Sequence, residues 1–435
     1  MTQFEYRAGR LHAESVDLVG LAEALGTPTY VYSRAGLEAA WRGFDDALGE
    51  WPHLICYAVK ANSNLGVLGV LADLGSGFDI VSEGELERVL AVGGDPSRIV
   101  FSGVGKSPRE MARALEVGIR CFNVESPEEL FVLDDVAGHL GKVAPVSLRV
   151  NPDVDAQTHP YIATGLAESK FGIPIEEAAP LYRAAAARAN LSVVGVDCHI
   201  GSQLTSLSPI QNALAKVLEL VDALGEEGIC LEHVDVGGGL GIQYRDEVPP
   251  SFEAYARAVC SIVGERSLEI VIEPGRAICG NAGVLLTKVE YTKRNGTHGF
   301  AIVDAAMNDF LRPALYQAWC DIVPLLEGDQ VAEGLVDVVG PVCESADFLG
   351  RGRTLEASPG AFLAVRSAGA YGFVMSSNYN SRPRAAEVVV DGAVYHVTRT
   401  RESIADLMRG ESTLAQTTGH RSSNPGTQVN VRETG

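Results

Sequence analysis

Short apolar or β-branched runs alternate with longer amphipathic segments over the first two thirds of the chain. The runs that predict strands are 54–59, 78–81, 99–101, 119–124, 145–150, 193–199, 231–236 and 268–272. The segments between them carry apolar residues at helical spacing, and several open with Ser or Pro and close with Gly, as helix caps do. Eight strands that alternate with helices over about 230 residues predict a (β/α)₈ barrel. An open, doubly wound parallel sheet is the alternative.

The pattern changes after residue 280. Residues 283–306 and 385–403 alternate around NG and DG dipeptides, which are hairpin signals. We therefore expect a barrel over 27–279 and a mostly β domain over 280–412. Residues 1–26 are expected to pack with the β domain, and the polar residues 413–435 to form a disordered tail.

Composition narrows the range of partners. The 435 residues are 46% hydrophobic and 21% charged, which is typical of a globular protein with ample core. A net charge of −21 argues against binding to nucleic acid or to anionic lipid, and favours a small-molecule partner. The N-terminus shows no apolar signal segment, and no apolar run is long enough to span a membrane. Eight scattered cysteines without a CxxC pair indicate a reduced, cytoplasmic protein.

Polar residues stand where each predicted barrel strand ends, which is where barrel enzymes place their chemistry. These residues are Lys60, Asp79, Ser102, Glu125, Arg149, His199, Gly237–Gly239 and Glu273. Stability alone does not explain eight polar strand ends. We therefore expect them to surround one site.

Lys60 follows the apolar strand LICYAV. Burial there would lower the pKa of the amine and leave a nucleophile suited to Schiff-base chemistry. The alternative is a lysine that extends out of the strand end to pair with Asp79 or Glu125. Position alone leaves both interpretations open.

The other motifs are individually weak. The glycines 237–239 could cradle a phosphate with their backbone N–H groups, or only form a tight turn. His199 could be structural, with Ser202 as a phosphate-binding hydroxyl. Glu273 could face a protonated ring nitrogen and Arg276 an anion, or the two could pair locally.

The predicted β domain contains two further candidate motifs. Cys343 could donate a proton while Glu344 holds an amine, or they could be a half-buried thiol beside a solvated carboxylate. The segments 308–318 and 369–384 add Arg312, Tyr316 and Tyr371.

Ten motifs together carry a resemblance. They are YAVKAN, FSGVGKS, FNVES, LRVNPDVDAQTHPYIATGLAESKFGI, HIGSQ, GGGLGI, EPGR, LRPALY, CESADFLG and GAYGFVMSSNYNSRPRAAEV, in this order from residue 57 to about 388. In these blocks the chain resembles the fold-type III, pyridoxal-phosphate-dependent decarboxylases. Members of that family have a (β/α)₈ barrel followed by a β domain. They form homodimers with shared active sites.

The resemblance implies cofactor roles for matching positions. Lys60 would bind pyridoxal phosphate covalently beside Asp79, His199 would stack on its ring, and Glu273 would face its ring nitrogen. The phosphate would lie among Ser202, Gly237, Gly238, Gly239, Gly275 and Arg276. No metal is expected.

The resemblance also implies substrate contacts. The far carboxylate of the substrate would be held by Arg276, Arg312 and Tyr316. Cys343 and Glu344 would come from the other subunit, the thiol as proton donor and the carboxylate as amine ligand. Tyr371 would contact both the cofactor and the substrate, and would also reach the neighbouring site. Many family members have a histidine where this chain has Cys320, a change expected to leave the site residues untouched.

The expected reaction is decarboxylation of meso-2,6-diaminopimelate to L-lysine and CO₂. Ornithine- and arginine-type relatives carry Asp after the cysteine, so the CES motif favours diaminopimelate. Relatives that act on ornithine or carboxynorspermidine remain the alternatives. A non-catalytic pyridoxal-phosphate-binding protein is a further alternative, although such proteins consist of the barrel alone.

Overall fold

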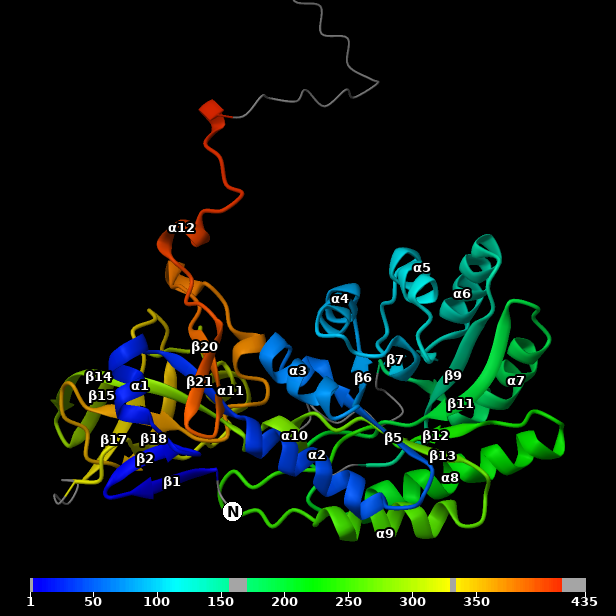
Figure 1. Cartoon of the computed structure of the whole chain (residues 1–435), viewed down its shortest axis with the longest axis horizontal. Coiled ribbons are helices and arrows are strands. Elements are labelled where there is room, and N and C mark those ends of the chain that lie inside the picture. The colour runs from blue at the N-terminus through cyan, green and yellow to red at the C-terminus, as the bar shows by residue number, and fades with distance from the viewer. Residues whose placement is uncertain (1–2, 156–169, 329–333, 417–435) are drawn as a thin grey trace, which may run out of the picture.

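The protein has two units that lie side by side, an α/β barrel and a second unit built mainly of strands (Figure 1). The structure, a computed structural model, describes residues 3–155, 170–328 and 334–416. Part of the predicted tail, residues 417–435, and part of the longest family motif, residues 156–169, lie outside the described residues.

Eight parallel strands form the barrel. They are β5 (His53–Ala58), β6 (Gly77–Ile80), β7 (Ile99–Phe101), β8 (Cys121–Val124), β9 (Ala144–Asn151), β11 (Leu191–Asp197), β12 (His233–Asp235) and β13 (Glu269–Ile272). Each pairs with the next, β13 pairs with β5, and β8 pairs with β9, so the sheet closes on itself. The short β10 (Ile173–Pro174) pairs with β9. The barrel prediction is confirmed, and the open sheet is wrong.

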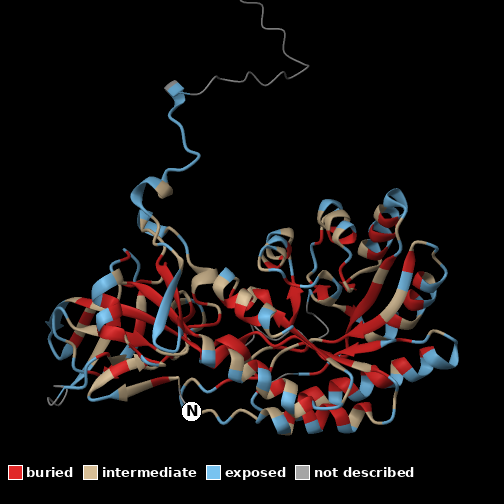
Figure 2. Ribbon diagram, viewed as in Figure 1, coloured by how far each residue is buried: buried red, intermediate tan, exposed pale blue. Residues whose placement is uncertain are grey.

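Helices cover the outside of the barrel. They are α2 (Arg34–Leu48), α3 (Leu65–Asp73), α4 (Glu83–Ala91), α5 (Pro108–Val117), α6 (Pro127–Leu140), α7 (Ile175–Ala186), α8 (Ser208–Glu226), α9 (Phe252–Val263) and the short α10 (Arg276–Cys279). The Ser107 hydroxyl accepts from the Glu110 N–H in a capping box that begins α5, and Gly118 ends it in a left-handed conformation. Buried residues follow the strands and the inner helix faces, while the outer faces are exposed (Figure 2). Among the described residues, no helix is long and apolar enough to cross a membrane.

The described strands after residue 280 all belong to the second unit. They are β14 (Gly283–Asn295), β15 (His298–Val303), β16 (Ile322–Pro324), β17 (Leu335–Val339), β18 (Phe348–Thr354), β19 (Phe362–Val365), β20 (Ala386–Asp391) and β21 (Val394–Arg399). As the turn signals predicted, β14 and β15 form a hairpin, and so do β20 and β21. Two short helices, α11 (Arg312–Tyr316) and α12 (Ile404–Leu407), complete the unit.

The N-terminal residues form β1 (Phe4–Arg7), β2 (Arg10–Ala13), β3 (Val16–Asp17) and α1 (Leu18–Leu25). Their apolar side chains pack in one buried cluster with Val284, Leu286 and Val388 of the second unit.

One strand differs from the expected division of the chain. β4 (Thr29–Ser33) falls in the segment assigned to the barrel, yet it pairs with β14 and β20 of the second sheet. All five of its residues are buried. A strand buried on both faces has no alternation that would show which sheet it joins, so the sequence could not place it.

Candidate active site

Lys60 stands at the mouth of the barrel. It lies in a single 3₁₀ turn (Val59–Ala61) that follows β5, and its side chain is 36% exposed. Its Nζ lies 2.6 Å from Oδ2 of Asp79, which is fully buried on β6. The strand therefore delivers the amine to a carboxylate on the neighbouring strand.

The pKa of Lys60 is raised, not lowered as the sequence predicted. Burial disfavours the charged amine, but Asp79 and Glu273 attract it more strongly. The prediction considered the apolar strand and not the carboxylates opposite. Lys60 is a paired ammonium here, because its amine forms an ion pair with Asp79. Its role in Schiff-base chemistry stays a prediction.

A cavity of about 330 Å³ opens next to this position. Its walls bring together six of the predicted residues: His199, Ser202, Arg276, Arg312, Tyr316 and Tyr371. Gln203, Tyr244, Glu247, Ala318 and Trp319 complete the lining. Lys60 lines a separate opening with Glu85, Arg88 and Phe373. Both units of the chain therefore contribute to the cavity.

His199 is held as a neutral imidazole. Burial, together with the positive charges of Arg149 and Lys60, lowers its pKa well below the ordinary value. The Gly238 N–H donates to Nδ1 at 3.0 Å, which leaves the ring proton on Nε2. A neutral ring with a fixed orientation suits stacking against a flat, uncharged surface.

The three glycines after β12 allow the backbone to approach its neighbours closely. A Cβ on Gly238 would lie 2.3 Å from the Glu273 carbonyl oxygen, and one on Gly239 would lie 2.6 Å from that of Gly201. Gly237 and Gly239 also have φ of 68° and 106°, which favours glycine. The segment therefore presents bare backbone at the barrel mouth, beside His199.

Arg276 connects two sides of the cavity. Its Nη2 donates to the Ser202 hydroxyl at 3.1 Å, and its Nη1 donates to the Tyr244 hydroxyl at 2.5 Å. Gly275, which precedes it, packs against Ala61, whose Cβ would lie only 2.9 Å from a Cβ at this position. Glu273 instead accepts from the Ser102 hydroxyl and the Asn123 amide. These contacts do not support the alternative of a local Glu273–Arg276 ion pair.

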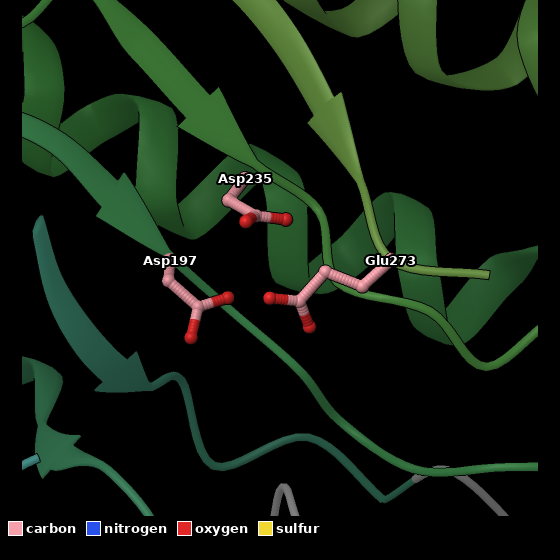
Figure 3. A group of neighbouring side chains, drawn as sticks. All are labelled: Asp197, Asp235 and Glu273. Carbon is pink, nitrogen blue, oxygen red and sulfur yellow. The ribbon is translucent and has the colours of Figure 1, made fainter. Parts of the chain in front are cut away.

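Three buried carboxylates meet inside the barrel, pointing toward one another (Figure 3). Asp197 ends β11, Asp235 ends β12, and Glu273 follows β13, with carboxylate oxygens within 4.8 Å of one another. Burial and mutual repulsion raise the pKa of Glu273 and Asp197 well above the ordinary range, and burial raises that of Asp235 to about 6. Glu273 is thus a carboxyl group with high proton affinity.

Arg312 and its surroundings form the far wall. The residue is buried on α11, and its guanidinium lies 4.4 Å from the centre of the Tyr244 ring. Its Nη1 also contacts Cys320 Sγ at 3.8 Å. The expectation that Cys320 touches no site residue is therefore wrong. Tyr316, at the end of the same helix, lines the cavity.

Tyr371 lies in the cavity of its own chain. Its N–H donates to the Ala61 carbonyl, and the Arg276 guanidinium lies 4.9 Å from its ring centre. The Ala61 contact holds it beside Lys60 of its own chain. That it also reaches a neighbouring subunit's site stays a prediction.

Cys343 and Glu344 differ from the other candidates. Both are exposed, and neither is among the described residues that line the 330 Å³ cavity. The Cys343 N–H donates to the Asn380 side chain, and the Tyr379 hydroxyl donates to Glu344. The structure does not bring them to Lys60 within one chain.

Several known proteins are similar to this chain in sequence and in fold. Residues 34–280 match the family described as pyridoxal-dependent decarboxylase, pyridoxal binding domain. The diaminopimelate decarboxylase of Pseudomonas aeruginosa is 61% identical over 96% of this chain and 100% of its own length, and that of Vibrio cholerae is 60% identical over 96% and 100%. This chain belongs to the diaminopimelate decarboxylase family. The crystal structure of the Helicobacter pylori diaminopimelate decarboxylase complexed with L-lysine is 44% identical and superposes with a TM-score of 0.88, covering 90% of this chain and 98% of that one.

The site fits the cofactor of the diaminopimelate decarboxylase family, pyridoxal phosphate. Arg276, the Ser202 hydroxyl and the backbone at Gly239 are suited to a phosphate, while the N–H groups of Gly237 and Gly238 donate to Asp235 and His199. Glu273, with its raised pKa, can share a proton with a ring nitrogen. Arg276 Nε has no hydrogen-bond partner among the described residues, and a bound anion would give it one.

The sequence did not single out Asp197, Asp235, Asn123 or Tyr244. The two aspartates end the observed strands β11 and β12, one or two residues before the predicted strand ends, so the strand-end argument missed them by that margin. Tyr244 lies in a loop, where a single sequence gives no such signal.

Proposed function

We propose that this chain decarboxylates meso-2,6-diaminopimelate to L-lysine and CO₂ with pyridoxal phosphate as cofactor. The observation that carries the proposal is that two guanidinium groups, Arg276 and Arg312, line one cavity beside the cofactor residues. A substrate with a second carboxylate at its far end satisfies both charges.

In this proposal the cofactor phosphate is held by Arg276, Ser202 and the backbone at Gly239. Lys60 binds the cofactor covalently, with Asp79 orienting the amine. His199 packs on the ring face as a neutral imidazole. Bound pyridoxal phosphate supplies an electron sink for the electron pair that remains when CO₂ leaves.

The side chains control the proton and the orientation. Glu273 holds a proton at its carboxyl group, because burial and the neighbouring carboxylates raise its pKa, and it can share this proton with the ring nitrogen. Arg312 and Tyr316 hold the far carboxylate, so the carboxylate to be lost is fixed beside the ring. Lys60 receives or returns a proton at its amine when the substrate amine takes its place.

The proton that replaces CO₂ comes, in this proposal, from Cys343 of a second copy of the chain, while Glu344 of that copy binds the distal amine. A proton donor must lie within reach of the reacting atom. Because both residues are exposed on the surface of their own chain, they are free to enter the site of a second copy. We therefore propose a homodimer with shared active sites. The biosynthetic reaction and the scattered free cysteines favour a cytoplasmic location.

The substrate is tested by comparing turnover of meso-diaminopimelate, L-ornithine and carboxynorspermidine by the holoenzyme. We expect CO₂ and L-lysine from the first, with kcat/KM at least about 10³-fold above the others, because those lack the carboxylate that the arginines bind. Absence of lysine formation, or a preference for ornithine, would overturn the assignment.

The dimer is tested by mixing two inactive variants, Lys60→Ala and Cys343→Ala. Mixed dimers would contain one intact site, so about a quarter of native activity should return after subunit exchange. The control is the Lys60→Ala variant taken through the same exchange without Cys343→Ala, which should stay inactive. No recovery in mixtures shown to contain mixed dimers would contradict a shared site.

A further inference from the structure

Tyr244 contacts both arginines of the cavity, although neither its position nor its motif suggested a role. It lies in the loop between β12 and α9, it is half-buried, and it lines the cavity. Its hydroxyl accepts from Arg276 Nη1 at 2.5 Å. Its ring lies 4.4 Å from the Arg312 guanidinium.

The loop holds this tyrosine in place. One Glu247 carboxylate oxygen accepts from the N–H groups of Tyr244 and Arg245, at 3.0 and 2.7 Å. Gln203 accepts from the Ile242 N–H and donates to the Ile242 carbonyl. The tyrosine is therefore supported from both sides along the chain.

Two cations in one partly buried cavity repel each other, and each loses hydration. Tyr244 offers each of them a different partner, its hydroxyl oxygen to Arg276 and the negative face of its ring to Arg312. The guanidinium groups of Arg276 and Arg312 can therefore lie side by side in the cavity wall before an anion binds. Such preorganisation reduces the cost of binding a carboxylate.

We infer that Tyr244 is a positioning residue that holds Arg276 and Arg312 in register as a receptor for the far carboxylate of the ligand. This inference rests on the proposed function, because it assumes that the two arginines bind that carboxylate. Tyr244 itself does not need to touch the ligand.

The test uses L-lysine and cadaverine, which differ only by that carboxylate, as competitive inhibitors of the holoenzyme. In Tyr244→Phe, which keeps the ring and loses the hydroxyl, we expect the inhibition constant of L-lysine to rise about tenfold, the usual effect of losing a hydrogen bond to a charged group. That of cadaverine should stay unchanged. Tyr244→Leu, which removes both partners, should raise the L-lysine constant about a hundredfold.

The control is Tyr291→Phe, since Tyr291 is exposed on β14 and does not line the cavity. Cofactor absorbance should be equal in native protein, Tyr244→Phe and the control. Unchanged L-lysine affinity in both Tyr244 variants, equal weakening of both ligands, or loss of cofactor from Tyr244→Phe would each overturn the inference. Equal binding of L-lysine and cadaverine by the native enzyme would instead contradict the proposed carboxylate receptor.

Discussion

The barrel mouth and the loop that carries Cys343 are built on opposite principles. At the mouth, Asp79, Glu273 and Arg276 are nearly or fully buried, and each is held by side chains from neighbouring strands or loops. Cys343 and Glu344 lie on an exposed loop. The residues of the barrel mouth all come from one chain. Cys343 and Glu344, in contrast, do not line the cavity of the chain that carries them.

Because only the barrel mouth holds the cofactor, cofactor binding and turnover should be separable. Variants of the barrel mouth should affect both properties, because the cofactor and the substrate share those residues. Variants of the Cys343 loop should affect turnover alone.

Replacing Lys60 by Ala should have the largest effect. We expect a loss of about 10⁴-fold or more in kcat, the order of loss seen when a covalent nucleophile is removed. Borohydride reduction of native holoenzyme, followed by peptide mapping, should place the cofactor on Lys60. Lys293→Ala, on the exposed part of β14, is the control. Labelling of any other lysine would contradict the assignment of the barrel mouth.

Replacing Cys343 by Ala should lower turnover without loss of the cofactor. Removing a positioned proton donor should lower kcat by about 10²–10⁴-fold. The absorption band of the bound cofactor should keep its intensity, because the barrel alone holds the cofactor. Cys230→Ala, also an exposed thiol, should leave kcat unchanged. Full turnover in Cys343→Ala would rule the thiol out as the acid.

The barrel also contains a buried base at its opposite end. His233 begins β12, and burial, with a smaller effect of Arg120, lowers its pKa from 6.5 to about 3. The folded protein then binds fewer protons than the unfolded chain between these values, so stability should fall as pH falls through that window, by up to about a few kcal/mol. His233→Asn should flatten this dependence in thermal melts between pH 7 and pH 4. An unchanged slope would show that other groups cause the loss in acid.

In the second unit, Asp309 should make the stability of the protein fall as the pH rises, opposite in direction to the effect of His233. Burial raises the pKa of Asp309 from 3.8 to about 7, although the hydrogen bond from the Ala306 N–H and the charge of Arg382 both act to lower it. Its folded form keeps a proton that the unfolded chain releases, so its contribution to stability is lost as pH rises toward 7. Asp309→Asn should reduce the fall in melting temperature between pH 5 and pH 8. A steeper fall in the variant would contradict this sign.

The sequence predicted the repetitive part of the molecule well. Each barrel strand was placed within two residues of its observed bounds, because turn residues and apolar runs recur along the chain. The same argument predicted that Lys60, His199 and Glu273 would lie close together, since they follow strands of one barrel.

The features that the sequence did not predict depend on tertiary contacts between segments that are far apart in the chain. The raised pKa of Lys60 comes from carboxylates on other strands, and the role inferred for Tyr244 comes from two arginines far from it in the chain. The pairing of β4 with the second sheet has the same origin. Periodicity describes one segment at a time, whereas these properties belong to pairs of segments.

The Cys343 loop has a further consequence through Asp347. This buried carboxylate accepts from the N–H groups of Met307 and Val342, each at 2.7 Å, and so fixes the loop from within its own chain. For the proposed dimer, the loop has its bound shape before the second copy arrives. Little conformational entropy is then lost on association, and subunits can meet as nearly rigid bodies. The lifetime of the dimer, rather than folding of the loop, would then set how long each active site remains assembled.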